Sequence, residues 1–133
     1  MMNFYFTWVL ATIMLMILDA CWLPLAWKPF YKPVYDDIQG GLVNMRIGSA
    51  VFTWVLLGLV IALHQTHTMN PPVHPFWTGA LSGFIIYGVY NFTNHAILKH
   101  YTLGLSIIDT LWGSFALGVV SYLLSLRTRR TGL

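Results

Sequence analysis

The chain has 133 residues, of which 57% are hydrophobic, 16% are aromatic and only 8% are charged. A soluble domain carries about 25% charged residues because its surface must face water. This composition therefore excludes a water-soluble globular protein and indicates a protein whose solvent is lipid. The single cysteine, Cys21, excludes an internal disulfide and a cysteine-rich metal site.

The net charge of +3 comes from few residues, and three of the seven basic ones gather in the C-terminal tail: Arg127, Arg129 and Arg130. Such a short cluster is typical of an anchor beside a membrane span. A nucleic-acid-binding protein would need a basic stripe on a folded face. We therefore expect membrane lipids as partners and no nucleic acid.

Four apolar segments follow one another along the chain, at residues 4–25, 47–63, 76–98 and 103–126. Each approaches or exceeds the roughly 17–25 residues that a helix needs to cross a bilayer. Strands of a membrane barrel would instead alternate over segments of about 10 residues. We therefore expect an all-α, polytopic membrane protein, with four transmembrane helices in an antiparallel bundle and a single domain over residues 1–133.

The connections between these segments differ in character. Residues 26–45 interleave aromatic side chains with lysines, which predicts an interfacial segment at headgroup level, and Pro29 and Pro33 are expected to prevent a regular long helix at its start. The second connection is a polar loop rich in His and Pro. The third, at 99–102, is so short that the last two helices must form an antiparallel hairpin.

Four crossings put both termini on the same side of the membrane. Basic residues in the connections do not decide the orientation, and the clustered tail arginines slightly favour termini on the cytoplasmic or inner side. We expect an integral membrane location, in a bacterial inner membrane or in the membrane of a virus or organelle. Neighbouring membrane subunits or a second copy of the chain are further candidate partners.

Polar residues inside the apolar segments converge on one level. Asp19 lies near the end of the first segment, Asn91, Asn94 and His95 near the end of the third, and Asp109 near the start of the fourth. At a rise of about 1.5 Å per residue, alternating crossings place four of them roughly 8–13 Å below the same surface, with Asn91 one turn deeper. We expect them to form one polar layer.

The spacing of these residues also predicts which faces meet. The third segment carries a single helical stripe of Gly83, Tyr87, Asn91, Asn94 and His95. Its Gly79-x-x-x-Gly83 pattern permits close helix approach. In the fourth segment, the small residues Gly113 and Ala116 accompany Asp109, which predicts a helix interface there.

An acid followed three places on by a tryptophan occurs twice, in ILDACWL (17–23) and IIDTLWG (107–113). Trp112 is expected one turn deeper than Asp109. Trp22 is expected nearer the surface than Asp19, where it would join the aromatic belt. The two tryptophans are thus predicted at different depths, and the repeated pattern is only weak support for an internal repeat.

Placing a carboxylate in hydrocarbon costs at least about 2.5–3.5 kcal/mol, unless the group is paired, exposed to water or protonated. We therefore favour a site that binds or passes a small ligand, a lipid head group or a proton. No cofactor is expected, and no metal, because no close-spaced ligand motif is present. The candidate site residues are Asp19, Asp109, Asn91, Asn94, His95, Tyr87 and Trp112.

Two other functions stay open. The first is a structural or assembly protein of a cellular or viral membrane, in which the polar cluster holds helices together through interhelical hydrogen bonds of about 0.6 kcal/mol each. The second is a membrane-embedded enzyme acting on lipid, with Asp19 and Asp109 as general acid and base. Because no nucleophile is identified, we lean against enzymatic activity, and the catalytic residues of such an enzyme are unknown.

Four motifs in order resemble those of domain-of-unknown-function family 2177, a family of predicted membrane proteins. The resemblance spans nearly the whole chain and implies a small four-helix membrane protein, found in bacteria and some large DNA viruses, with no established activity. One departure is Asn91, where the family usually has an acid. The matching residues are Asp19, Trp22 and Leu23; Phe30 and Tyr31; Tyr90, Thr93 and Asn94; and Asp109, Trp112 and Gly113.

Overall fold

A computed structural model describes residues 3–66 and 74–131. Every regular element in these two ranges is helical, and neither contains a strand, which confirms the predicted all-α class. The elements in chain order are α1 (Phe4–Ala26), a π-helical segment η1 (Trp27–Tyr31), α2 (Lys32–Gln39), α3 (Ile47–Thr66), α4 (Pro75–Ile97) and α5 (Leu103–Thr131).

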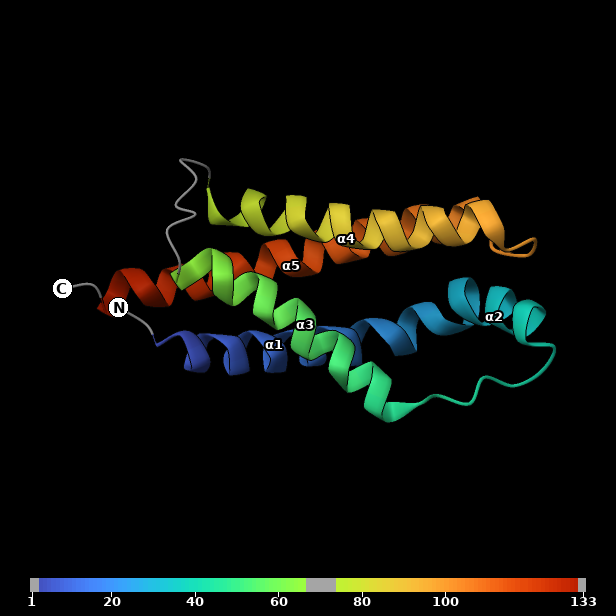
Figure 1. Ribbon diagram of the computed structural model, residues 1–133, viewed down its shortest axis with the longest axis horizontal. Helices are drawn as coiled ribbons and strands as arrows, with labels where there is room; N and C mark the ends of the chain where they lie inside the picture. Colours follow the sequence, from blue (N-terminus) through green and yellow to red (C-terminus); the bar gives the residue numbers. More distant parts are fainter. Residues whose placement is uncertain (1–2, 67–73, 132–133) are drawn as a thin grey trace.

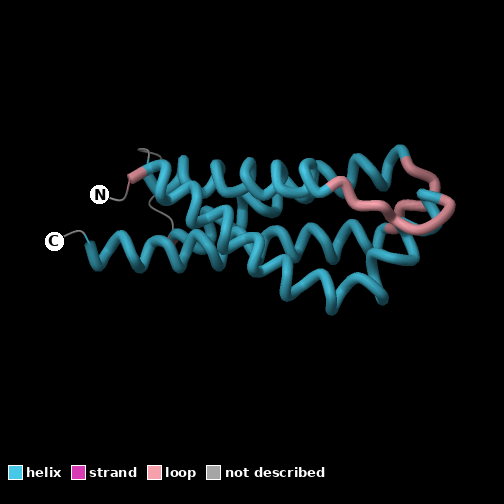
Figure 2. The backbone as a smooth tube through the Cα atoms, turned by 90° about the horizontal axis from the view of Figure 1, so that it is seen from below, coloured by secondary structure: helices cyan, strands magenta, loops and turns pink. Residues whose placement is uncertain are grey.

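The helices form an antiparallel bundle (Figure 1). Helices α4 and α5 lie side by side as a hairpin, α3 crosses α1 obliquely, and α5 contacts both α1 and α3. Helix α1 begins and α5 ends at one end of the bundle. The loops at 40–46 and 98–102 lie towards the opposite end, where α2 also packs (Figure 2). The polar residues near this second end come from several helices.

The regular α-helix is interrupted after α1, as predicted, but the prolines do not end the helical stretch, which continues to Gln39. The chain widens into the π-helical turn η1, in which the Lys32 N–H donates to the Trp27 carbonyl. A π turn leaves some backbone groups without an α-helical partner, so it tolerates Pro29, which has no N–H. Pro33 then occupies the first turn of α2, where a missing N–H is harmless. Gly40, with φ of 68°, ends α2 in the left-handed conformation.

Three helical stretches are long and apolar enough to cross a membrane: Phe4–Gln39, Ile47–Thr66 and Leu103–Arg127. This supports the membrane class. Helix α4 has 23 residues, enough to span hydrocarbon, but it is not among the three. Its final turns carry Asn91, Asn94 and His95, which lower its hydropathy. Composition therefore supports three of the four predicted crossings, and α4 is covered on one face by α5.

The interface between α4 and α5 is too close for side chains at several glycines. A Cβ built on Gly79 would lie 2.3 Å from the Leu117 carbonyl oxygen, and one on Gly83 would lie 2.2 Å from the Gly113 carbonyl oxygen. A Cβ on Gly113 would lie 2.1 Å from the ring of Tyr87. The small-residue pattern of the third apolar segment thus permits the close approach that brings Tyr87 and Asn91 against α5.

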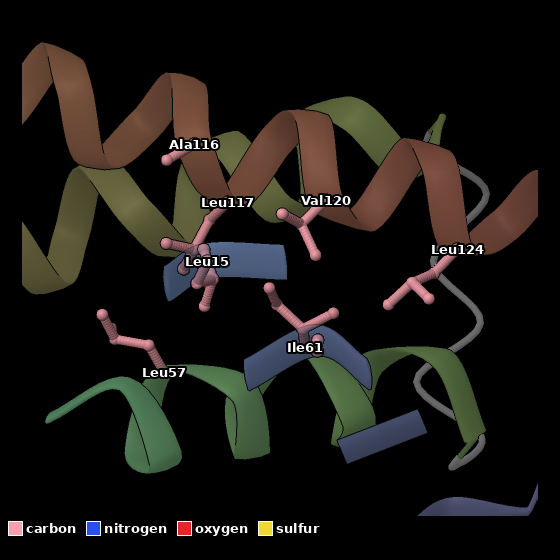
Figure 3. Close-up of a cluster of buried hydrophobic side chains, with 8 residues drawn as sticks. Leu15, Leu57, Ile61, Ala116, Leu117, Val120 and Leu124 are labelled. Carbon is pink, nitrogen blue, oxygen red and sulfur yellow. The ribbon is translucent and has the colours of Figure 1, made fainter. Parts of the chain in front are cut away.

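The apolar core joins the two halves of the bundle. Leucine and β-branched side chains from α1, α3 and α5 meet in its centre (Figure 3). Ile61 of α3 and Leu117 of α5 are fully buried there. This packing fixes α1 and α3 against α5, and so sets the position of the polar residues at the adjoining level.

Candidate functional site

Asp19 joins three helices through two indole groups. The Nε1 of Trp54 on α3 donates to Oδ2 of Asp19 over 2.6 Å. The Nε1 of Trp112 on α5 donates to Oδ1 over 2.7 Å. Both oxygens of the carboxylate therefore accept a hydrogen bond from a group that can only donate.

Asp109 is held in the same manner by different partners. The Tyr31 hydroxyl on η1 donates to Oδ1 over 2.5 Å, and the Asn91 amide on α4 donates to Oδ2 over 2.6 Å. Asp109 thus ties α5 to α4 and to the π-helical segment. Charge-assisted bonds of this kind are roughly twice as strong as neutral ones.

The tryptophans of the two D-x-x-W motifs contact each other, so the prediction that they lie at different depths is wrong. The rings of Trp22 and Trp112 stack with centroids 4.6 Å apart and planes 5° from parallel. Trp22 also donates to the Tyr31 hydroxyl over 3.1 Å and is thus part of the cluster. Because α1 and α5 run in opposite directions, Asp19 and Asp109 lie on opposite sides of this indole pair.

Both polar atoms of the Asn91 side chain, Nδ2 and Oδ1, form hydrogen bonds. Besides its bond to Asp109, Nδ2 donates to the Tyr87 carbonyl over 2.8 Å, and Oδ1 accepts from the Tyr101 hydroxyl over 2.5 Å. The side chain is 0% exposed. Burial raises the pKa of Tyr101 to about 12, so its hydroxyl stays protonated and remains a donor at neutral pH.

His95 and Asn94, the two remaining candidates of the predicted stripe, lie at the edge of the polar cluster. His95 is exposed, and its Nδ1 lies 2.9 Å from the Tyr101 carbonyl oxygen. Asn94 is half-buried, and its side chain interacts with the Tyr101 hydroxyl. Both reach the aspartates only through other residues. Of the seven candidates, the structure connects Asp19 directly to Trp112 and Asp109 directly to Asn91, with Tyr87 beside Asn91.

Neither aspartate has a basic partner among the described residues. Contacts between basic and acidic side chains there include Lys32 with Asp36, one turn apart on α2, and the imidazole of His100 with Asp37, 3.9 Å apart. The donors to Asp19 and Asp109 are all neutral side chains. Within residues 3–66 and 74–131, no three His, Cys, Asp or Glu side chains gather as a metal site would require.

A groove of about 370 Å³ lies between α3 and α4 and reaches Asp109. This volume is near the lower end of the range for small-ligand sites, about 300–1,000 Å³. Thr53 of α3 and Tyr90 of α4 are exposed, so the groove opens along helices whose outer faces are apolar. Its lining residues are Thr53, Leu57, Ile86, Tyr87, Tyr90 and Asp109.

Tyrosines gather next to this groove. The rings of Tyr31 and Tyr35 stack with centroids 6.4 Å apart, and Tyr35 meets Tyr101 edge to face at 6.5 Å. The Tyr35 hydroxyl also lies near Tyr90, which lines the groove. The π-helical segment and α2 thus cover Asp109 with aromatic side chains from one side, and the groove approaches it from another.

Besides Trp22, sequence reasoning missed three members of the cluster. Trp54 lies inside the second apolar segment, where an indole N–H needs a buried acceptor, and this requirement was a usable signal. Tyr31 belongs to the F-Y motif of the family resemblance, which marked the position without indicating its partner. Tyr101 sits in the tight turn before α5, and its 10-residue separation from Asn91 carries no periodic pattern.

Comparison with known proteins supports the membrane class. A family described as "Predicted membrane protein (DUF2177)" matches residues 4–126. No curated protein and no solved structure matches the sequence significantly. The matched range includes α1 through most of α5, and with them Asp19, Asp109 and the groove. The chain therefore belongs to the DUF2177 family of predicted membrane proteins.

Proposed function

We propose that this membrane protein binds the polar end of a small amphipathic molecule in the groove between α3 and α4, with Asp109 as its polar contact. The observation that carries the proposal is the position of this acid. It lines a groove of about 370 Å³ whose other walls are mostly apolar or aromatic. A ligand from the bilayer would keep its chain among the exposed apolar side chains and bring its head to the carboxylate.

The hydrogen-bond geometry favours binding over proton passage. Both partners of Asp19 are indole N–H groups, which donate but do not accept a proton. Asn91, one of the two partners of Asp109, likewise carries an amide that does not relay protons. A proton wire through the described side chains would be interrupted at each of these positions.

Hydrolysis of a lipid receives little support from the hydroxyl of Ser106. Ser106 Oγ donates to the backbone carbonyls of Thr102 and Asn91 at 3.0 and 3.3 Å. An activated nucleophile would instead donate to a side-chain base.

A second candidate function, helix assembly, is favoured by a specific observation. All four carboxylate oxygens of Asp19 and Asp109 accept hydrogen bonds, and together these bonds connect α1, η1, α3, α4 and α5. Such a network specifies how the helices pack. This role is compatible with ligand binding, because the groove approaches Asp109 without breaking any of these bonds.

Native mass spectrometry of the full chain in maltoside micelles tests the proposal. Ten-carbon amphiphiles with cationic, neutral and anionic heads serve as probes. Thr53→Phe places a ring at the mouth of the groove and should abolish binding of any amphiphile that occupies it. Val51→Phe, a matched enlargement of an exposed residue on the same helix that does not line the groove, should leave binding unchanged. Equal binding by both variants would overturn the proposal.

A further inference from the structure

The charge around the groove is unbalanced. Asp109 lines it and Asp19 lies on the other side of the indole pair, and neither has a Lys, Arg or His within 4 Å among the described residues. Neutral donors solvate a carboxylate but do not cancel its charge. An anionic head would meet no cation in the groove and would be repelled by Asp109.

Asp109 also keeps acceptor capacity for a ligand. An ionised carboxylate offers about four lone-pair positions, and Tyr31 and Asn91 occupy two. Thr53 Oγ1 donates to the Ser49 carbonyl over 3.0 Å, which leaves its own lone pairs available. Asp109 and Thr53 thus supply acceptors to the groove from α5 and α3, and the hydroxyls of Tyr87 and Tyr90 can accept as well as donate. An alkylammonium group supplies only donors, and a quaternary ammonium group supplies a positive charge without donors.

Two aromatic rings complete the lining. Tyr87 and Tyr90 are one turn apart on α4 and both face the groove. The faces of aromatic rings attract organic cations, and the attraction reaches about 2 kcal/mol where water is excluded. A carboxylate beside aromatic faces is the combination that recognises alkylammonium and quaternary ammonium groups.

We infer that the ligand of this groove carries a cationic head, an alkylammonium or quaternary ammonium group on an apolar chain. This inference rests on the proposed binding function and adds the charge of the ligand. The ammonium lies against the free lone pairs of Asp109, with Tyr87 and Tyr90 beside it. The alkyl chain follows Leu57 and Ile86 towards the opening.

The experiment compares four probes on the wild-type chain in neutral maltoside micelles: decylammonium, decyltrimethylammonium, decanol and decyl sulfonate. Their dissociation constants are measured by native mass spectrometry titration. Both cations should bind at least about tenfold more tightly than decanol, because the carboxylate and the rings add to the apolar contacts. Decyl sulfonate should bind more weakly than decanol.

Two variants test whether Asp109 produces the preference for cationic probes. Asp109→Asn should remove the preference for the two cations over decanol, with both measured on the variant itself, whereas Val51→Phe should alter no probe. The wild-type comparison does not depend on how well Asp109→Asn folds.

The possible failures are distinguishable. If all four probes bind equally and Thr53→Phe abolishes their binding, the groove binds amphiphiles and the inference about charge is wrong. If no probe binds in a manner sensitive to Thr53→Phe, the proposed function and this inference both fail.

Discussion

The indole of Trp112 stacks on that of Trp22 at 4.6 Å and donates its N–H to Asp19, the acid of the other D-x-x-W motif. Trp22 donates its N–H to the Tyr31 hydroxyl, which in turn donates to Asp109, the acid of the second motif. Each tryptophan is therefore linked to the acid of the other motif, and not to the acid three residues before it: Trp112 directly, and Trp22 through Tyr31. The two motifs work as an exchanged pair, and the stack lies between the two acids.

This exchange predicts that the two aspartates respond differently to amide substitution. In Asp19→Asn, the new NH₂ faces an indole N–H whichever way the amide turns, so one indole is left without an acceptor, at a cost of about 1–3 kcal/mol. In Asp109→Asn, the Tyr31 hydroxyl can reverse and accept from the new NH₂. Thermal unfolding in maltoside micelles should show the larger loss for Asp19→Asn.

The matched comparison for this prediction is Trp54→Phe. It removes one donor from Asp19 without creating an opposed pair of donors, and should destabilise the chain less than Asp19→Asn does. Equal losses for the two amide variants would mean that the tyrosine cannot reverse, and would contradict the argument.

The stacked indoles should be energetically coupled. Offset or stacked aromatic pairs contribute about 0.5–1.5 kcal/mol beyond the apolar area they bury. A double-mutant cycle of Trp22→Leu and Trp112→Leu should therefore give a coupling energy of that size, measured as free energies of unfolding. The pair Trp22→Leu and Trp8→Leu provides the control, because Trp8 donates to the Val55 carbonyl elsewhere in the bundle. Additive losses in the first cycle would show that the stack contributes nothing of its own.

Close approach of α4 and α5 predicts opposite outcomes at two glycines. Gly83→Ala would place its methyl group 2.2 Å from the Gly113 carbonyl oxygen, a backbone atom that cannot move alone. We expect a loss of about 1–3 kcal/mol as the helices separate. Gly104→Ala, in the first turn of α5, meets nothing within 4 Å and should be neutral or slightly stabilising. Comparable unfolding temperatures for the two variants would be inconsistent with the interface described.

The sequence predicts the helices well because each helix depends on the composition of its own segment. Apolar runs long enough to cross lipid can satisfy their backbone only as helices, and the small residues around Gly83 predict the face of α4 that meets α5. The pairing of each hydrogen-bond donor with its acid depends on residues that are far apart in the sequence. Trp54 lies 35 residues from Asp19, and Tyr31 lies 78 residues from Asp109, so only the packed bundle pairs them. The path of residues 27–39 escaped prediction because a π turn tolerates prolines that an α-helix would not.

The sequence resemblance implies an acid at the position of Asn91, and the environment of Asn91 predicts what an acid would do. In Asn91→Asp, a carboxyl oxygen would replace the Nδ2 that donates to Asp109 over 2.6 Å and to the Tyr87 carbonyl. A protonated carboxyl still donates to Asp109, whereas an ionised one opposes it. Since like charges this close share one proton, the folded state of the variant should hold a proton that the unfolded chain releases.

The sign of the resulting pH dependence follows directly. A proton bound more tightly in the folded than in the unfolded chain stabilises the fold at low pH, and this contribution is lost as the pH rises. The unfolding temperature of Asn91→Asp should therefore approach that of the wild type near pH 5 and fall progressively towards about pH 8. The wild type and Asn94→Asp, whose side chain does not contact Asp109, should show no such additional fall. A variant equally stable at both pH values would mean that residue 91 and Asp109 are not in contact, and would refute the geometry from which the cluster is built.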